Sequence, residues 1–207
     1  MNWKKVVKDK KKQPTTGEYG DWKEQIAAEC YYQCVYCSIH ENPWGGIDHY
    51  HVEHYRPKGL KKFAHLKNDI LNLFYACPVC NRFKSDDWPA DCPNDFSIAS
   101  YPDPSEVDYS ELIDFNDVDY TIVGKFPASR YMIERLYLNR PQLIYERREE
   151  ILKSAGRRLM DDIMSLVFQL NENEYYQHAL AAQQRIIKLY HDREKVRPYK
   201  LAEIRRP

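Results

Sequence analysis

The chain has 207 residues, of which 43% are hydrophobic and 30% are charged, as in a globular protein of one domain with or without a helical extension. No apolar run approaches the roughly 20 residues that a membrane-spanning helix needs, and the lysine-rich start lacks the apolar stretch of a secretory signal. The formal net charge is zero, but residues 85–124 carry 11 acidic residues and neither lysine nor arginine. The rest of the chain therefore has 20 acidic and 31 basic residues and can attract a polyanion.

The chain begins with a polar segment. Six lysines lie within the first 12 residues, with Gly17 and Gly20 after them, which predicts a flexible or loosely docked basic arm over residues 1–20. A short helix is predicted over Asp21–Tyr32, because Asp21 is a suitable N-cap and apolar residues recur on one face after it.

A ββα unit is predicted next. Tyr50–Tyr55 is rich in aromatic and β-branched residues, which favours a strand, and Pro57 ends it. Leu71–Ala76 is apolar and aromatic and predicts a second strand. Pro78 suits the first turn of a helix that runs to about Lys84.

The second half of the chain changes from irregular to helical. Residues 88–123 contain four prolines and most of the clustered acids, so we predict an irregular segment with a short strand around Thr121–Val123. A short helix is expected over Ala128–Leu138. Two longer helices, one from Asn139 to about Leu170 with apolar residues at a 3.6 period and one over Glu174–Asp192, are expected to form an antiparallel hairpin on the ββα unit.

These elements predict an α+β fold in four parts. The parts are the arm (1–20), a zinc-containing ββα domain (21–90), an acidic irregular segment (91–126) and a C-terminal helical region (127–207). For the acidic segment, a solvated surface rich in turns is favoured over a surface that repels misplaced nucleic acid or binds a basic partner.

Four cysteines form two CxxC pairs, Cys34 with Cys37 and Cys77 with Cys80. Paired knuckles of this spacing are typical of a structural Zn²⁺ bound by four thiolates, which leaves no open position for water. A redox CxxC is the alternative, but neither pair lies in a thioredoxin-like βαβ pattern. Because such thiolates require a reducing compartment, we expect a cytoplasmic protein. The other two cysteines, at positions 30 and 92, are expected to be buried thiols.

Between and after these pairs lie Glu53-His54-Tyr55-Arg56-Pro57-Lys58, then Asn72, then Asn81-Arg82-Phe83-Lys84. This order resembles the motif of HNH endonucleases of the His-Me finger type, with asparagine at the third position. The EH-[FY]-RPK segment is similar to a bacterial subgroup that also carries paired CxxC knuckles. The resemblance covers roughly residues 30–90, and it implies a zinc-stapled ββα-metal core that hydrolyses DNA, usually double-stranded.

The chemistry of each residue agrees with this resemblance. Histidine titrates near neutral pH, so His54 is expected to be the general base for an attacking water. Glu53 and Asn81 offer hard oxygen ligands for Mg²⁺ or Mn²⁺, although many HNH motifs have aspartate where this chain has Glu53. Asn72 is expected to orient His54 through hydrogen bonds across the loop between the strands. The basic residues expected to contact phosphates are Arg56, Lys58 and Lys84.

Two further expectations concern the biological role. Small nucleases of the EH-[FY]-RPK subgroup resemble the effector subunits of Septu-type anti-phage systems, which implies an ATPase partner. The alternative function is a non-catalytic zinc-knuckle module that binds nucleic acid or protein, in which His54, Asn72 and Asn81 have structural roles only. In that case Asn72 is a turn residue and Asn81 caps the helix after the second knuckle.

Overall fold

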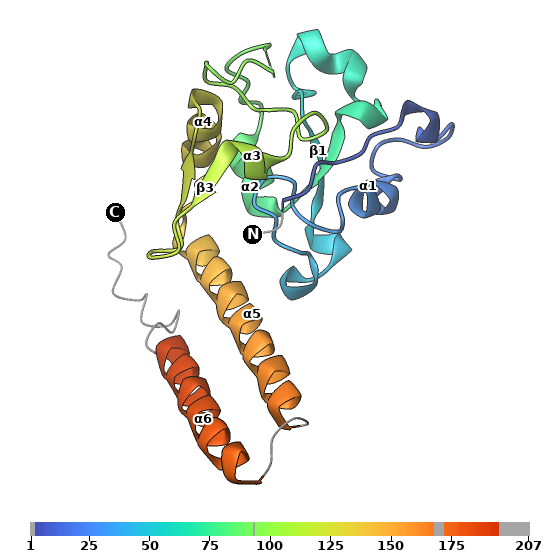
Figure 1. Cartoon of the computed structure of the whole chain (residues 1–207). Coiled ribbons are helices and arrows are strands. Elements are labelled where there is room, and N and C mark those ends of the chain that lie inside the picture. Colours follow the sequence, from blue (N-terminus) through green and yellow to red (C-terminus); the bar gives the residue numbers. More distant parts are fainter. Residues whose placement is uncertain (1–2, 93, 168–171, 195–207) are drawn as a thin grey trace. The chain divides into compact units, whose positions relative to one another are not determined.

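The structure of the protein is a computed structural model that describes residues 3–92, 94–167 and 172–194. The chain divides into two compact units, Met1–Arg140 and Pro141–Pro207 (Figure 1). In the described residues, helices are combined with two small antiparallel sheets, in agreement with the predicted α+β class. Among the helices described, none has the length and apolar character needed to cross a membrane.

The predicted ββα unit is present in the first compact unit. Strand β1 (His51–His54) pairs antiparallel with β2 (Leu73–Ala76) along its whole length. Helix α2 (Pro78–Lys84) follows β2 at once, because Pro78 has no N–H to leave unpaired in the first turn. The sulfur of the N-cap residue Cys77 accepts a hydrogen bond from the amide of Cys80 and closes that turn. The strands are slightly shorter than predicted, and the helix has the predicted bounds.

Helix α1 (Lys23–Glu29) contacts both strands of this sheet. Its inner side chains, Ile26 and Ala27, are fully buried, and Trp22 is buried just before it. The predicted helix was longer at both ends. The chain leaves the helix through Tyr31 and Tyr32, which both have positive φ and so cannot continue it.

Tyrosines form much of the core around the sheet. The fully buried ones are Tyr36, Tyr50, Tyr55, Tyr75 and Tyr101, and each of their hydroxyls donates a hydrogen bond inside the protein. A buried tyrosine requires such a partner because an unpaired hydroxyl in an apolar environment is costly. This part of the protein is therefore held by specific polar contacts as well as by apolar burial.

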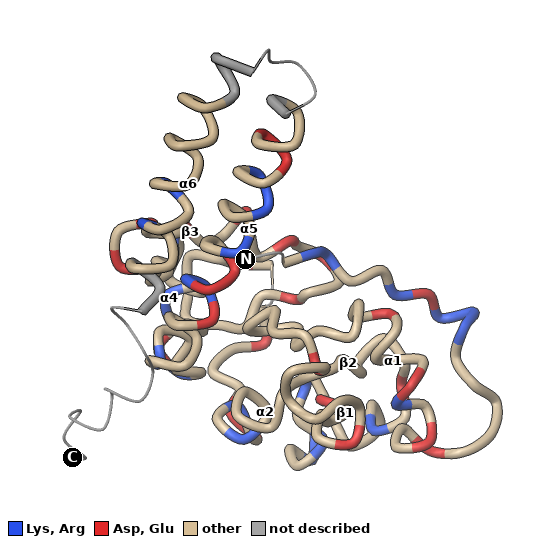
Figure 2. Tube along the Cα trace, turned by 90° about the horizontal axis from the view of Figure 1, so that it is seen from below, with Lys and Arg blue, Asp and Glu red and all other residues tan. Residues whose placement is uncertain are grey.

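Of the two predicted states of the N-terminal arm, its described part adopts the docked one. The indole of Trp3 donates to the carbonyl of Tyr36, and the amide of Val6, which is buried, donates to the carbonyl of Pro104. Lys8 forms an ion pair with Glu29 at 2.7 Å. Figure 2 shows the basic residues that follow one another along this arm before α1.

The acidic segment is more regular than predicted. It contains the short helix α3 (Tyr109–Leu112) and the hairpin of β3 (Ile113–Phe115) and β4 (Ile122–Gly124). Four of its aspartates accept hydrogen bonds from the serine or threonine two residues later and so close local turns; they are Asp95, Asp103, Asp108 and Asp119. These bonds support the favoured reading of this segment as a turn-rich surface.

The remaining helices follow the predicted pattern. Helix α4 (Pro127–Arg135) contacts β4 and completes the first unit. The second unit consists of α5 (Pro141–Val167) and α6 (Glu172–Glu194), which form the predicted antiparallel hairpin (Figure 1). The expected end of the first of these helices, at Leu170, lies outside the described residues.

Candidate functional site

The four cysteines of the two CxxC pairs meet in one buried cluster. Their sulfurs, from Cys34, Cys37, Cys77 and Cys80, all lie within 4.8 Å of one another, and those of Cys37 and Cys77 are 3.8 Å apart. Tetrahedral zinc, with Zn–S distances of about 2.3 Å, requires sulfurs about 3.8 Å apart. The cluster could therefore hold one zinc ion, as the spacing predicted.

Each pair lies in a tight turn that is fixed to the sheet. In the first turn, the amide of Ser38 donates to the carbonyl of Cys34, and Ser38 has a positive φ of 56°. The amide of Val35 donates to the carbonyl of Tyr75 in β2, and the second pair begins two residues after Tyr75. The bound ion would thus join the two CxxC turns, which are separated by 39 residues in the sequence, at strand β2.

The electrostatics of the four cysteine side chains also favour the binding of a cation. Burial raises the pKa of Cys34, whereas hydrogen bonds from Cys34 and its neighbours hold the pKa of Cys77 well below its ordinary value. Four thiolates this close to one another and shielded from water would repel one another. A divalent cation relieves that repulsion, because it binds all four as thiolates. Of the two spare cysteines, Cys30 is buried as expected but Cys92 is exposed.

A separate cavity of about 540 Å³ brings together three of the four predicted catalytic residues, whereas Asn72 lines a different cavity. Glu53 and His54 reach it from β1, Asn81 from α2, and Lys58 from the loop after β1. Two further basic residues, Lys23 and Arg82, line the same cavity. Asp86 and His51 also line it, so the cavity combines two carboxylates, two imidazoles and one carboxamide with a basic rim.

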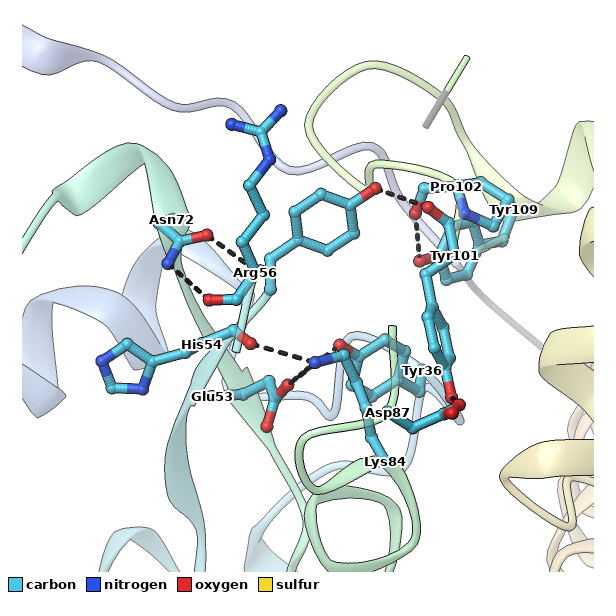
Figure 3. A network of polar contacts seen from close by, with 11 residues as sticks. Tyr36, Glu53, His54, Arg56, Asn72, Lys84, Asp87, Tyr101, Pro102 and Tyr109 are labelled. Atoms are coloured by element: carbon cyan, nitrogen blue, oxygen red, sulfur yellow. Dashed lines mark hydrogen bonds and ion pairs between the residues drawn. The ribbon is translucent and has the colours of Figure 1, made fainter. Parts of the chain in front are cut away.

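Glu53 is held by a buried ion pair. The ammonium of Lys84 lies 2.7 Å from Oε1 of Glu53, and the hydroxyl of Tyr36 donates to the same oxygen at 3.3 Å (Figure 3). Burial raises the pKa of Glu53, and Lys84 opposes that rise. Since the two contacts are made to Oε1, the second oxygen, Oε2, is the one suited to a cation in the cavity.

His54 is buried, and one of its ring nitrogens is already engaged. Nε2 lies 2.9 Å from the carbonyl of Lys67, and because a carbonyl can only accept, Nε2 must carry the proton in the neutral ring. Nδ1 then keeps its lone pair. The ring packs edge-on against Tyr19, with centroids 4.7 Å apart. Burial lowers the pKa of His54 to about 4, so the ring is neutral at pH 7.

Asn72 spans the loop that joins the two strands, as predicted, but it contacts the loop rather than the ring of His54. Its Oδ1 accepts from the amide of Arg56 at 2.8 Å, and its Nδ2 donates to the carbonyls of Arg56 and Leu66 at 3.0 and 3.4 Å (Figure 3). Leu66 immediately precedes Lys67, whose carbonyl receives His54. Asn72 therefore orients His54 through the backbone of this loop.

Two of the three expected phosphate contacts lie elsewhere. Lys84 is fully buried and bonds both Glu53 and the carbonyl of His54, so its ammonium is occupied inside the protein. The side chain of Arg56 points away from Glu53 and His54 and lines a different cavity (Figure 3). Lys58 is exposed and lines the cavity of His54, where its ammonium donates to the hydroxyl of Tyr19 at 2.5 Å.

The sequence analysis missed several cavity residues. Tyr19 comes from the arm, where no periodic pattern marks it. His51 lines the cavity wall as an exposed residue. Lys23 was counted only as part of a helix. Arg82 was quoted within the motif without a role, although it directly follows Asn81. A carbonyl ligand such as that of Lys67 has no sequence signal at all.

Comparisons of the chain with protein-family models, with curated proteins and with solved structures give no match.

Proposed function

We propose that the protein is a metal-dependent nuclease of the HNH type, which hydrolyses phosphodiester bonds of DNA. The observation that carries the proposal is the shared cavity of Glu53, His54 and Asn81, three motif residues that are 28 positions apart at most. The motif resemblance described above supplies the reaction. The thiolate cluster supports the proposal by fixing α2, which lines the cavity, and β2, which pairs with the cavity-lining strand β1.

His54 is the proposed general base. With Nε2 donating to Lys67, Nδ1 is the nitrogen that can take a proton from a water molecule. The low pKa makes the base form available in nearly all molecules at neutral pH but leaves it weakly basic. A bound phosphate, being anionic, would raise the proton affinity of the ring and so strengthen the base where the reaction occurs.

Glu53 through Oε2, with Asn81, would hold the Mg²⁺ or Mn²⁺, which would stabilise negative charge on the phosphate and the leaving oxygen. The side chain of Asn81 makes no hydrogen bond to any described residue and is available as a ligand. Of the two carboxylates that line the cavity, Glu53 is buried and Asp86 is exposed, so phosphate oxygens and water must complete the shell, as is usual for Mg²⁺. The metal is therefore expected to bind weakly until nucleic acid is present.

The basic rim positions the substrate. Lys58, Lys23 and Arg82 surround the cavity and can contact phosphates on either side of the scissile bond. Such contacts carry no base information. The sequence resemblance also suggests an effector role in anti-phage defence with an ATPase partner, which would supply the targeting that the cavity does not.

A second candidate function rests on the thiolate cluster alone. A non-catalytic zinc-knuckle module would keep the four cysteines and use the basic rim for binding nucleic acid, or another face for binding a protein. Such a module would not require an imidazole beside a carboxylate with only one of its ring nitrogens hydrogen-bonded. The two functions differ in one measurable respect, which is whether bound DNA is cut.

The test is cleavage of plasmid DNA in Mg²⁺ or Mn²⁺ by the wild type and by His54→Ala. The expected loss for the variant is about 100-fold or more, the usual contribution of a general base, with zinc content unchanged. His65→Ala is the matched control, because His65 is exposed and lies in the same loop. Equal cutting by all three proteins would reveal a contaminating enzyme and remove the support for the nuclease. Binding of DNA without any cutting, with the proposed partner present, would favour the zinc-knuckle module.

A further inference from the structure

Arg140 lies directly against the thiolate cluster. Both terminal nitrogens of its guanidinium are 3.7 Å from the sulfur of Cys80, and one of them is 3.9 Å from that of Cys77. The same group donates to the carbonyls of Leu136 and Tyr137 at 3.2 and 3.3 Å. One guanidinium thus joins the sulfurs to the C-terminal end of α4.

The surroundings of the Arg140 guanidinium favour an anion beside it. Its Nε is buried and has no hydrogen-bond partner in the described part of the protein. The side chain of Arg140 is partly buried. A charge that is removed from water is costly unless an opposite charge pairs with it.

The cysteine cluster with zinc bound, called the loaded centre below, is that anion. Four thiolates and one divalent ion carry a net charge of −2, and the cluster is buried, so water cannot screen it. Sulfurs bound to zinc remain good acceptors, and cationic donors around them strengthen the site and set its affinity. Among the described residues, Arg140 is the basic side chain with hydrogen bonds to these sulfurs.

We propose that Arg140 is the counter-ion of the tetrathiolate centre, and that occupation of the centre thereby fixes the turn of residues 136–140. This turn is where the first unit ends, and α5 begins at the next residue, Pro141. The proposal goes beyond the nuclease function and does not depend on it, since it concerns only the metal centre.

The contacts that hold the turn of residues 136–140 are expected to be lost together. Tyr137 has a positive φ of 48°, a conformation that costs energy and persists only when its surroundings hold it. Its ring stacks on Phe83 of α2, the helix that carries Cys80, with centroids 4.9 Å apart. Asn139 pairs with both backbone groups of Ile122. Without a loaded centre, Arg140 would be a partly buried charge facing neutral thiols, and the α2 side of the turn would loosen.

The first experiment measures zinc affinity by competition with a chromophoric chelator. Arg140→Met is expected to weaken zinc binding by about 10-fold or more, the usual effect of losing a group that hydrogen-bonds metal ligands. Arg130→Met is the matched control, because Arg130 also donates to two backbone carbonyls, those of Gly124 and Lys125, but touches no sulfur. Zinc affinity of Arg140→Met within twofold of the wild type would overturn the proposal.

The second experiment uses the wild type and therefore does not depend on the variant folding. Amide exchange is followed with zinc bound and after its removal by the chelator. Amides of residues 136–140 are expected to lose protection together with those of α2, whereas β3 and β4 are expected to keep theirs. Unchanged protection of residues 136–140 on zinc removal would refute the coupling.

A cobalt-loaded Arg140→Lys protein adds a spectroscopic check. If the guanidinium contacts the sulfurs, the sulfur-to-cobalt absorption of this variant should be shifted from that of the wild type. An unshifted band would count against the contact.

Discussion

At the scale of single residues, the site depends on a buried lysine that sequence reasoning placed on the surface. Lys84 has no exposed side-chain area and pairs with Glu53, whose exposed fraction is 4%. Its ammonium also lies 5.5 Å from the ring centre of Tyr101, which adds a cation–π contact. Lys84 therefore acts on the cavity through Glu53, by fixing the carboxylate that would hold the metal.

We predict that Lys84→Met lowers the free energy of unfolding by about 3–5 kcal/mol, because it leaves the carboxylate of Glu53 buried without its cation. Urea denaturation measures this change. Lys62→Met is the control, since Lys62 pairs with Asp91 in an exposed ion pair whose loss should cost less than about 1 kcal/mol. Similar losses for the two variants would show that Glu53 is less dependent on Lys84 than its burial indicates.

A second residue-scale prediction concerns pH and His54. The folded pKa is about 4, below the ordinary value of 6.5, because of burial first and then the charges of Lys58, Lys84 and Lys67. The unfolded chain therefore binds more protons between these values, and the contribution of His54 to stability is full above pH 6.5 and is lost as pH falls towards 4.

The check compares urea midpoints at pH 5 and pH 7 for the wild type and for His54→Asn. The raised pKa of Glu53 gives a slope of the opposite sign, since a carboxyl that is protonated more readily when folded favours the folded state at low pH. Subtracting the variant removes that term. The wild type should lose more stability than His54→Asn at pH 5, and an equal loss would mean that His54 is not neutral and buried.

At the scale of elements, the loop between β1 and β2 holds the ring of His54 and leaves Nδ1 unprotonated in the neutral form. It is tied at both ends by Asn72, and it presents the carbonyl of Lys67 to the imidazole. The N-terminal arm meets the loop from outside, where the amide of Tyr19 donates to Asn68 and Lys67 pairs with Glu18. The tautomer of His54 is thus set by a loop that has no regular structure beyond 3-10 turns.

We predict that Asn72→Ala lowers the free energy of unfolding by about 2–3 kcal/mol, because it removes the amide that pairs with Arg56 and Leu66 and leaves their backbone groups unpaired. If the protein is a nuclease, cleavage should fall at least 10-fold because the carbonyl of Lys67 is no longer held in place. Asn68→Ala, which removes a single hydrogen bond in the same loop, should cost about 1 kcal/mol. Full cleavage by folded Asn72→Ala would contradict the positioning role.

The sequence was informative wherever the physical cause is local. The two knuckles, the strands and α2 follow from spacing, β-propensity and Pro78, all of which act over a few residues. The direction of Arg56 and the burial of Lys84 were not predictable, because they depend on residues far along the chain, such as Tyr101. The docking of the arm had no periodic signal, since it relies on isolated contacts such as that of Val6 with Pro104.

At the scale of the whole molecule, the acidic and basic residues have different tasks. Several of the acidic residues in residues 85–124 are aspartates that close local turns. The formal net charge of zero for the whole chain therefore does not describe the electrostatics of the cavity. The basic rim of Lys23, Lys58 and Arg82 lies outside that segment. Binding of a polyanion should therefore respond to salt through these few residues rather than through the net charge.

The final prediction concerns the metal centre and the cooperativity of the first unit. Cys77→Ser should reduce bound zinc from one ion per chain to a trace and should lower the melting temperature with loss of the near-ultraviolet signal of the tyrosine core, because structural zinc is coupled to folding. Cys92→Ser is the control, since Cys92 is exposed and stands outside the cluster. Full zinc content and stability in Cys77→Ser would exclude a four-cysteine site.

The docked arm has a practical consequence for reconstituting the protein from pieces. Residues 3–20 bring Val6 into the core and Tyr19 into the cavity, yet they join the rest of the unit through a short stretch with Gly17 and Gly20. If the protein is a nuclease, a chain that starts after this stretch should cleave DNA poorly, and a synthetic peptide of the arm should restore cleavage in trans. The arm would then serve as a detachable activator, a ligand made from the protein itself.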